Sequence, residues 1–142
     1  MRSIHPSRFL IFALRADALV SGAVAALQLL FTAWLAESLQ LPAALLVATG
    51  VFLVAYANLL LWLASRARLA RAWIGLVIVG NIGWAVACLA LGAFDGLALD
   101  ALGLGFLALQ AAAVLSFAAL EIKGLRLSTA APASLANAGS LS

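Results

Sequence analysis

The chain has 142 residues, of which 67% are hydrophobic and only 9% are charged, and its mean hydropathy is +1.20. A soluble domain is about 45–50% apolar and about 25% charged, so a water-soluble fold is excluded because it could not bury this many apolar side chains. The formal net charge of +3 does not indicate nucleic-acid binding, since the cations form no basic stripe interleaved with aromatic residues.

Taken in chain order, the sequence predicts a short polar lead, four apolar spans and a polar tail. A helix needs about 20 apolar residues to cross a hydrocarbon core of about 30 Å. We expect a cytoplasmic lead over residues 1–17, spans at about 18–36, 43–64, 72–94 and 97–120 in one transmembrane domain (18–127), and a disordered tail over 128–142. The apolar residues 9–14 either extend the first span or form a short helix at the membrane interface.

The positions of the charges predict the orientation of the spans. All eight Lys and Arg residues lie in the lead, between the second and third spans, or just after the fourth. The other two loops carry only the acidic residues Glu37, Asp95 and Asp100. Because Lys and Arg concentrate in cytoplasmic loops, both termini are expected in the cytoplasm. The spans lack the two-residue alternation of barrel strands, so the expected fold is all-α: an integral membrane, antiparallel four-helix transmembrane bundle, N-in and C-in.

Each span carries one side-chain amide. These are Gln28, Asn58, Asn81 and Gln110, and they lie at comparable depths in the predicted spans. An amide inside a membrane needs a partner to offset its desolvation. Three interpretations stay open: hydrogen bonds that join the helices, the lining of a small polar cavity, or contacts in a dimer.

A second candidate cluster consists of charged residues at the cytoplasmic rim. It comprises Arg15 and Asp17 at the start of the first span, Arg71 before the third and Glu121 after the fourth. One interpretation is a belt of interfacial salt bridges that fixes the packing of the bundle. The alternative is that Asp17 is a protonatable or cation-binding carboxylate at the mouth of a cavity that opens to the cytoplasm.

The sequence offers little for catalysis. His5 is the only histidine and lies before the first span, and Cys88 is the only cysteine. These counts do not allow bis-histidine haem ligation, a CxxC motif or a His/Cys metal cluster within one chain. We therefore expect no catalytic residue, no cofactor and no metal site, and we do not expect an enzyme.

Four short motifs are spread over most of the chain. They are Arg15-Ala-Asp17-Ala-Leu-Val-Ser-Gly22, Leu41-Pro42 followed by Gly50, Gly80-Asn81-Ile-Gly-Trp84, and Glu121 ahead of Gly124-Leu-Arg126. Over residues 14–126 this pattern resembles an uncharacterised group of small bacterial four-span inner-membrane proteins. The resemblance implies a location in a bacterial inner (plasma) membrane and carries no activity over to this chain.

Two classes of function follow from these features. The first is an interaction module, an accessory or scaffold subunit that binds another membrane protein or a second copy of itself. The second is the binding or transport of a small or lipophilic solute through a cavity lined by the four amides, as a homodimer, because four helices enclose little volume. In either case the lipid bilayer is a partner and nucleic acid is not.

Overall fold

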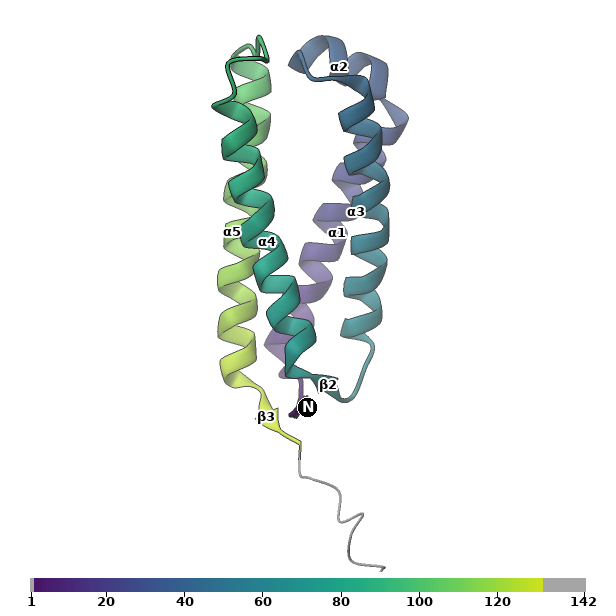
Figure 1. Ribbon diagram of the computed structural model, residues 1–142. Helices are drawn as coiled ribbons and strands as arrows, with labels where there is room; N and C mark the ends of the chain where they lie inside the picture. Colours follow the sequence, from purple (N-terminus) through teal and green to yellow (C-terminus); the bar gives the residue numbers. More distant parts are fainter. Residues whose placement is uncertain (1, 132–142) are drawn as a thin grey trace, which may run out of the picture.

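The computed structural model describes residues 2–131 and is built mainly of helices (Figure 1). The helices are α1 Arg8–Leu30, α2 Thr32–Leu39, α3 Ala43–Ala64, α4 Arg71–Gly92 and α5 Ala101–Leu127, and the strands are β1 Ser3–His5, β2 Leu69–Ala70 and β3 Thr129–Ala130. By length and composition, α1, α3, α4 and α5 are able to cross a membrane. The predicted all-helical architecture with four candidate spans is therefore confirmed.

Local signals set the ends of these helices. Ser7 caps α1, because its side chain accepts a hydrogen bond from Leu10 N at 3.1 Å. Asp100 caps α5 in the same way and accepts from Gly103 N at 2.8 Å. α2 ends before Gln40, whose left-handed backbone (φ 54°) is typical of a helix C-terminus.

The first span differs from the predicted one. We expected it over residues 18–36, whereas α1 covers Arg8–Leu30 and the chain then bends at Phe31 into the short α2. Residues 9–14 therefore extend the first span. The helix continues through Arg15 and Asp17 because the arginine side chain is exposed and the aspartate is buried among polar neighbours.

The fourth span and the tail also differ from the prediction. α5 runs from Ala101 to Leu127 instead of 97–120, because residues 97–100 are not helical and Asp100 caps the helix. Glu121 consequently lies within the helix and does not close it. Of the tail predicted to be disordered, Thr129–Ala130 forms β3, and residues 132–142 lie outside the described residues.

The four long helices pack as two antiparallel pairs. α1 packs along α3, α4 packs along α5, and α1 also contacts α5 (Figure 1). At the α1–α5 contact the backbones approach closely, since a Cβ on Gly124 would lie 2.7 Å from Leu10 Cα. α3 and α4 stand apart at the end that carries α2 and approach each other toward the end that carries the termini.

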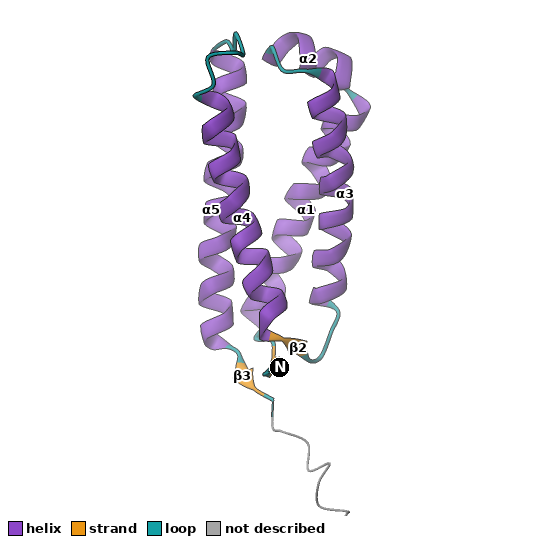
Figure 2. Cartoon of the chain, viewed as in Figure 1, coloured by secondary structure: helices purple, strands orange, loops and turns teal. Residues whose placement is uncertain are grey.

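A small antiparallel sheet, which we did not predict, closes the end of the bundle that carries the termini (Figure 2). The central strand β1 pairs with β2, where Ile4 faces Leu69, and with β3, where Ile4 faces Ala130. Ile4 is buried and belongs to the hydrophobic core. The sheet thus ties the N-terminal segment, the loop between α3 and α4 and the segment after α5 to one another.

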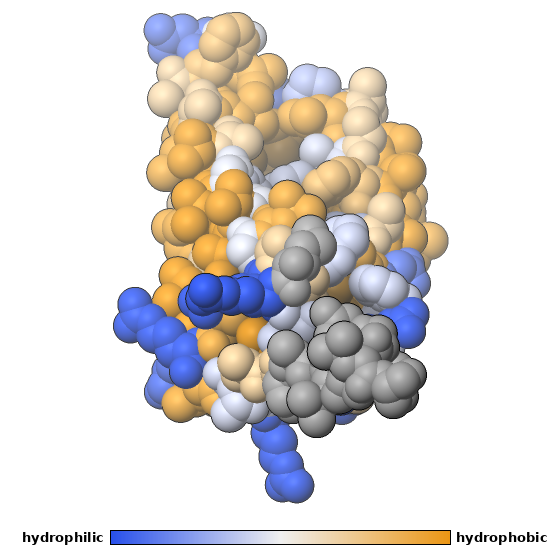
Figure 3. Space-filling model, turned by 60° about the horizontal axis from the view of Figure 1, so that its bottom comes forward, coloured by the Kyte–Doolittle hydropathy of each residue, from blue (hydrophilic) through white to orange (hydrophobic). Residues whose placement is uncertain are grey.

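The polarity of the surface differs between the end of the bundle that carries the sheet and its sides. Seen from the end that carries the sheet, hydrophilic residues gather at the tip and hydrophobic residues cover the flanks (Figure 3). Large apolar side chains on these flanks are freely exposed, among them Leu19, Leu30 and Leu109. Such flanks are the surface expected of helices surrounded by lipid.

Candidate functional site

Five polar side chains meet inside the bundle, in the half nearer the termini. Asp17 and Ser21 come from α1, Tyr56 from α3, Asn81 from α4 and Glu121 from α5, so every long helix contributes. Asp17 and Glu121 are 0% exposed and Asn81 is 2% exposed. We call these five residues the polar cluster.

Hydrogen bonds connect all members of the polar cluster. Asn81 Nδ2 donates to Asp17 Oδ2 at 2.9 Å and to Glu121 Oε2 at 3.2 Å. The Tyr56 hydroxyl lies 3.1 Å from both Asp17 Oδ2 and Asn81 Oδ1, and Ser21 Oγ donates to Asp17 Oδ1 at 2.9 Å. Because one amide nitrogen contacts both carboxyl groups, the two contacted oxygens are at most about 6 Å apart, a range in which charges interact strongly.

The polar cluster contains more hydrogen-bond acceptors than donors. Its protons are two on the Asn81 amide and one each on the Tyr56 and Ser21 hydroxyls, whereas two carboxylates and the Asn81 carbonyl offer five acceptor oxygens. The single Tyr56 proton faces two acceptors. Glu121 Oε1 is buried and has no hydrogen-bond partner in the described part of the chain. The polar cluster is therefore one donor short, and an unpaired buried acceptor is costly.

The structure does not assemble the predicted rim cluster of Arg15, Asp17, Arg71 and Glu121. It brings the two carboxyl groups together, but inside the bundle, and leaves both arginines exposed. Arg15 precedes Asp17 by two residues, which is about 200° around a helix, so it lies on the outer side of α1. Arg71 begins α4, about 15 Å along the axis from Asn81. The predicted salt-bridge belt is therefore not formed at these residues.

The four amides of the predicted spans are also separated. Asn81 belongs to the polar cluster, but Asn58 is exposed and donates to the Val54 carbonyl of its own helix at 2.8 Å. Gln28 and Gln110 line a different region, a cavity that is described next. Comparable depth did not bring the amides together, because each one points in the direction that its position around the helix dictates.

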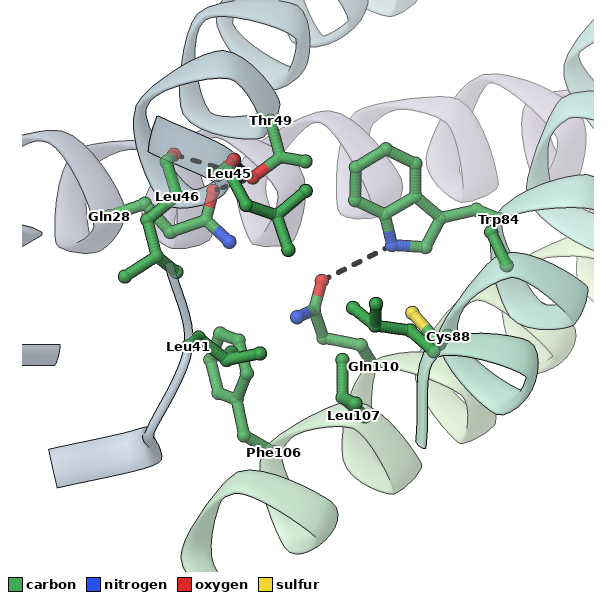
Figure 4. A pocket seen from close by; sticks show the side chains of 12 residues that line it. Gln28, Leu41, Leu45, Leu46, Thr49, Trp84, Cys88, Phe106, Leu107 and Gln110 are labelled. Atoms are coloured by element: carbon green, nitrogen blue, oxygen red, sulfur yellow. Dashed lines mark hydrogen bonds between the residues drawn. The ribbon is translucent and has the colours of Figure 1, made fainter. Parts of the chain in front are cut away.

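Gln28 of α1 and Gln110 of α5 line a cavity of about 120 Å³ between the two helix pairs (Figure 4). Gln28 Oε1 lies 3.1 Å from Thr49 Oγ1, whose single proton also faces the Leu45 carbonyl at 2.7 Å, and Gln110 Oε1 accepts a hydrogen bond from Trp84 Nε1 at 3.2 Å. Both amide nitrogens point into the cavity and have no hydrogen-bond partner among residues 2–131. The other lining residues are apolar: Leu41, Leu45, Leu46, Ala87, Cys88, Leu91, Phe106 and Leu107.

Two smaller cavities adjoin the larger one and reach the polar cluster. The first, of about 30 Å³, is lined by Asp17, Trp84 and Gln110 among others. The second, of about 60 Å³, is lined by Tyr56, Asn81 and Trp84 among others. Trp84 thus borders all three cavities.

Two members of the polar cluster were missed from the sequence. Ser21 follows Asp17 by four residues and so shares its helix face, a spacing that was available as a signal. Tyr56 is the only tyrosine in the chain and lies in the second predicted span. A buried tyrosine usually finds a hydrogen-bond partner for its hydroxyl, and this requirement was a signal that Tyr56 belongs to a polar site.

The described residues hold no further chemical centre. Cys88 is a buried free thiol, and no group of three or more His, Cys, Asp or Glu within residues 2–131 is arranged to hold a metal ion. Comparison with protein-family models, with curated proteins and with solved structures finds no match to this chain.

Proposed function

We propose that this chain is an integral membrane protein that binds a small lipophilic solute carrying a hydrogen-bond acceptor. The binding site is the cavity lined by Gln28, Trp84 and Gln110. One observation carries the proposal: two amide nitrogens without partners point into a space whose walls are otherwise largely apolar. Ligand sites commonly combine apolar walls with a few polar groups that fix the orientation of the ligand.

The proposal includes a location in the bacterial inner membrane with both termini in the cytoplasm. The length of the four apolar helices supports insertion, since 22 to 27 residues span about 33–40 Å. The distribution of charge supports the orientation, because the loop between α3 and α4 carries Arg66 and Arg68 whereas the opposite end carries Glu37 and Asp95.

The size and polarity of the cavity define the class of ligand. A volume of about 120 Å³ is close to that of an apolar protein cavity, about 150 Å³, which accepts benzene. The ligand should therefore be about as large as a six-membered ring. It needs an acceptor such as a carbonyl oxygen, because the amide nitrogens of Gln28 and Gln110 are donors that point into the cavity.

The test compares two probes of matched shape on the purified protein in mild detergent. Cyclohexanone has a carbonyl oxygen, and methylenecyclohexane replaces that oxygen with carbon. At a concentration tenfold above its Kd, a ligand raises the free energy of unfolding by about 1.4 kcal/mol. We expect cyclohexanone to raise Tm more than methylenecyclohexane does. Equal shifts with the two probes would overturn the proposal.

Paired variants locate the effect in the cavity. Gln110→Leu removes one of the two free donors and should reduce the difference between the probes, and Gln28→Leu combined with Gln110→Leu should abolish it. Asn58→Leu is the control, because Asn58 is exposed and is not among the residues that line the cavity, so the difference should persist. If Asn58→Leu abolished the difference as well, the cavity would not be the binding site.

The accessory or scaffold function stays a prediction, and so does the homodimer. The exposed apolar flanks suit contact with lipid and contact with another transmembrane helix equally well. Size measurement of the protein after crosslinking in native membranes tests both predictions. A stoichiometric foreign partner would favour the accessory function, and a pair of identical chains would favour the dimer.

A further inference from the structure

We propose that Asp17 and Glu121 form a proton-binding site that holds one exchangeable proton between their carboxyl groups. This inference is independent of the proposed solute, since it depends only on the polar cluster. Its ligand is a proton, and its location is the interior of the bundle, where all four long helices supply a side chain.

The first argument is the missing hydrogen-bond donor. Glu121 Oε1 is buried with no partner in the described part of the chain, and four protons serve five acceptor oxygens in the polar cluster. A proton on one carboxyl group converts one of these oxygens from an acceptor into a donor. That O–H can then donate to the other carboxylate, a short and strong type of hydrogen bond. One proton thus removes the deficit.

The second argument is charge. Asp17 on α1 and Glu121 on α5 accept hydrogen bonds only from uncharged groups, namely Ser21, Tyr56 of α3 and Asn81 of α4. The cations nearest in sequence, Arg15 and Lys123, are both exposed. Two carboxylates within about 6 Å repel each other, and the repulsion grows as the surroundings become less polar. A single shared proton leaves one negative charge, which the amide and hydroxyl donors can stabilise.

A proton suits this geometry better than a metal ion does. Asn81 Nδ2 contacts both carboxyl groups, so it places N–H protons where a bridging cation would need oxygen ligands. The acid pair also adjoins a cavity of about 30 Å³, lined by Asp17 and Gln110, which is the volume that one water molecule occupies in the liquid. A water at that position would give the proton a route between Asp17 and the larger cavity.

The test uses two carbodiimides and the intact protein in detergent. Dicyclohexylcarbodiimide is apolar and adds a protonated carboxyl group across one of its C=N bonds, so the mass of the protein rises by that of one reagent molecule. A water-soluble carbodiimide serves as the control, because it should modify exposed acids such as Glu37 and spare the buried pair. We expect one apolar label per chain near neutral pH, on Asp17 or Glu121 by peptide mass spectrometry, and a decrease as the pH is raised.

Single substitutions distinguish a shared proton from two separate ones. In Glu121→Gln the new amide supplies the missing donor, so Asp17 no longer needs a proton and its labelling should be lost; Asp17→Asn should likewise abolish the labelling of Glu121. Persistent labelling of the remaining acid in either variant would overturn the inference. Two results with the unmodified chain would also overturn it: no labelling of the pair at any pH, or protection by Na⁺ at constant pH, which would indicate a metal cation.

Discussion

Asn81→Leu is the substitution that most directly tests the polar cluster. Leucine has nearly the shape of asparagine, so the change removes hydrogen bonds with little change in packing. Asn81 donates to Asp17 and to Glu121 and accepts from Tyr56. Hydrogen bonds inside membrane proteins average about 0.6 kcal/mol and reach about 1.7 kcal/mol. Bonds to carboxylates belong at the upper end of that range, and buried partners left unpaired add to the cost, so we expect a loss of about 2–4 kcal/mol.

Thermal unfolding in mild detergent measures this loss. For a chain of this length each kcal/mol corresponds to about 3 °C, so Tm should fall by about 6–12 °C. The matched control is Asn58→Leu, because Asn58 is exposed and bonds only within its own helix. Its Tm should stay within the shift expected for about 0.5 kcal/mol. A small shift for Asn81→Leu, or an equal shift for the two variants, would refute the view that the polar cluster joins the helices.

Two further predictions concern packing and orientation. Gly124→Ala should lower the free energy of unfolding by about 1–3 kcal/mol, because its Cβ would meet the backbone of Leu10. Gly105→Ala should be neutral or stabilising, because nothing lies within 4 Å of its Cβ. Denaturation of both variants measures the two changes. In a cysteine-free background on intact cells, Asp95→Cys should react with a membrane-impermeant maleimide and Ser65→Cys should react only after permeabilisation, and the reverse pattern would contradict the proposed orientation.

The spans could be predicted because the bilayer imposes a strict constraint. Inside lipid every backbone group needs an internal hydrogen bond, so a run of about 20 apolar residues is a helix. The second predicted span, 43–64, matches α3 residue for residue. The predicted first span begins ten residues too late because Arg15 and Asp17 interrupt the apolar run in the sequence. A charged residue indicates the end of a span only when no polar side chain of another helix is available to it inside the bundle. The sequence of one helix does not show which side chains the other helices supply.

The polar cluster was harder to predict because depth along a helix does not determine direction around it. Asn58 and Tyr56 are two residues apart, about 200° around α3, so only one of them can face the interior. The structure turns Tyr56 inward and leaves Asn58 exposed. The same offset separates Arg15 from Asp17. Choosing between the members of each pair requires knowledge of how the neighbouring helices pack, which a single sequence does not contain.

The arrangement of the helices explains why the amides divide into two roles. Toward the termini α1 and α5 touch at Gly124, and there Asn81 bridges the two helix pairs through its hydrogen bonds with Asp17 of α1 and Tyr56 of α3. At the other end α3 and α4 stand apart, and that end holds the cavity into which Gln28 and Gln110 point. An amide near close-packed helices has other side chains as partners, whereas an amide beside open space keeps free donors. From the sequence, hydrogen bonds between helices and the lining of a cavity were alternative interpretations for all four amides. In the structure Asn81 joins helices, whereas Gln28 and Gln110 line a cavity.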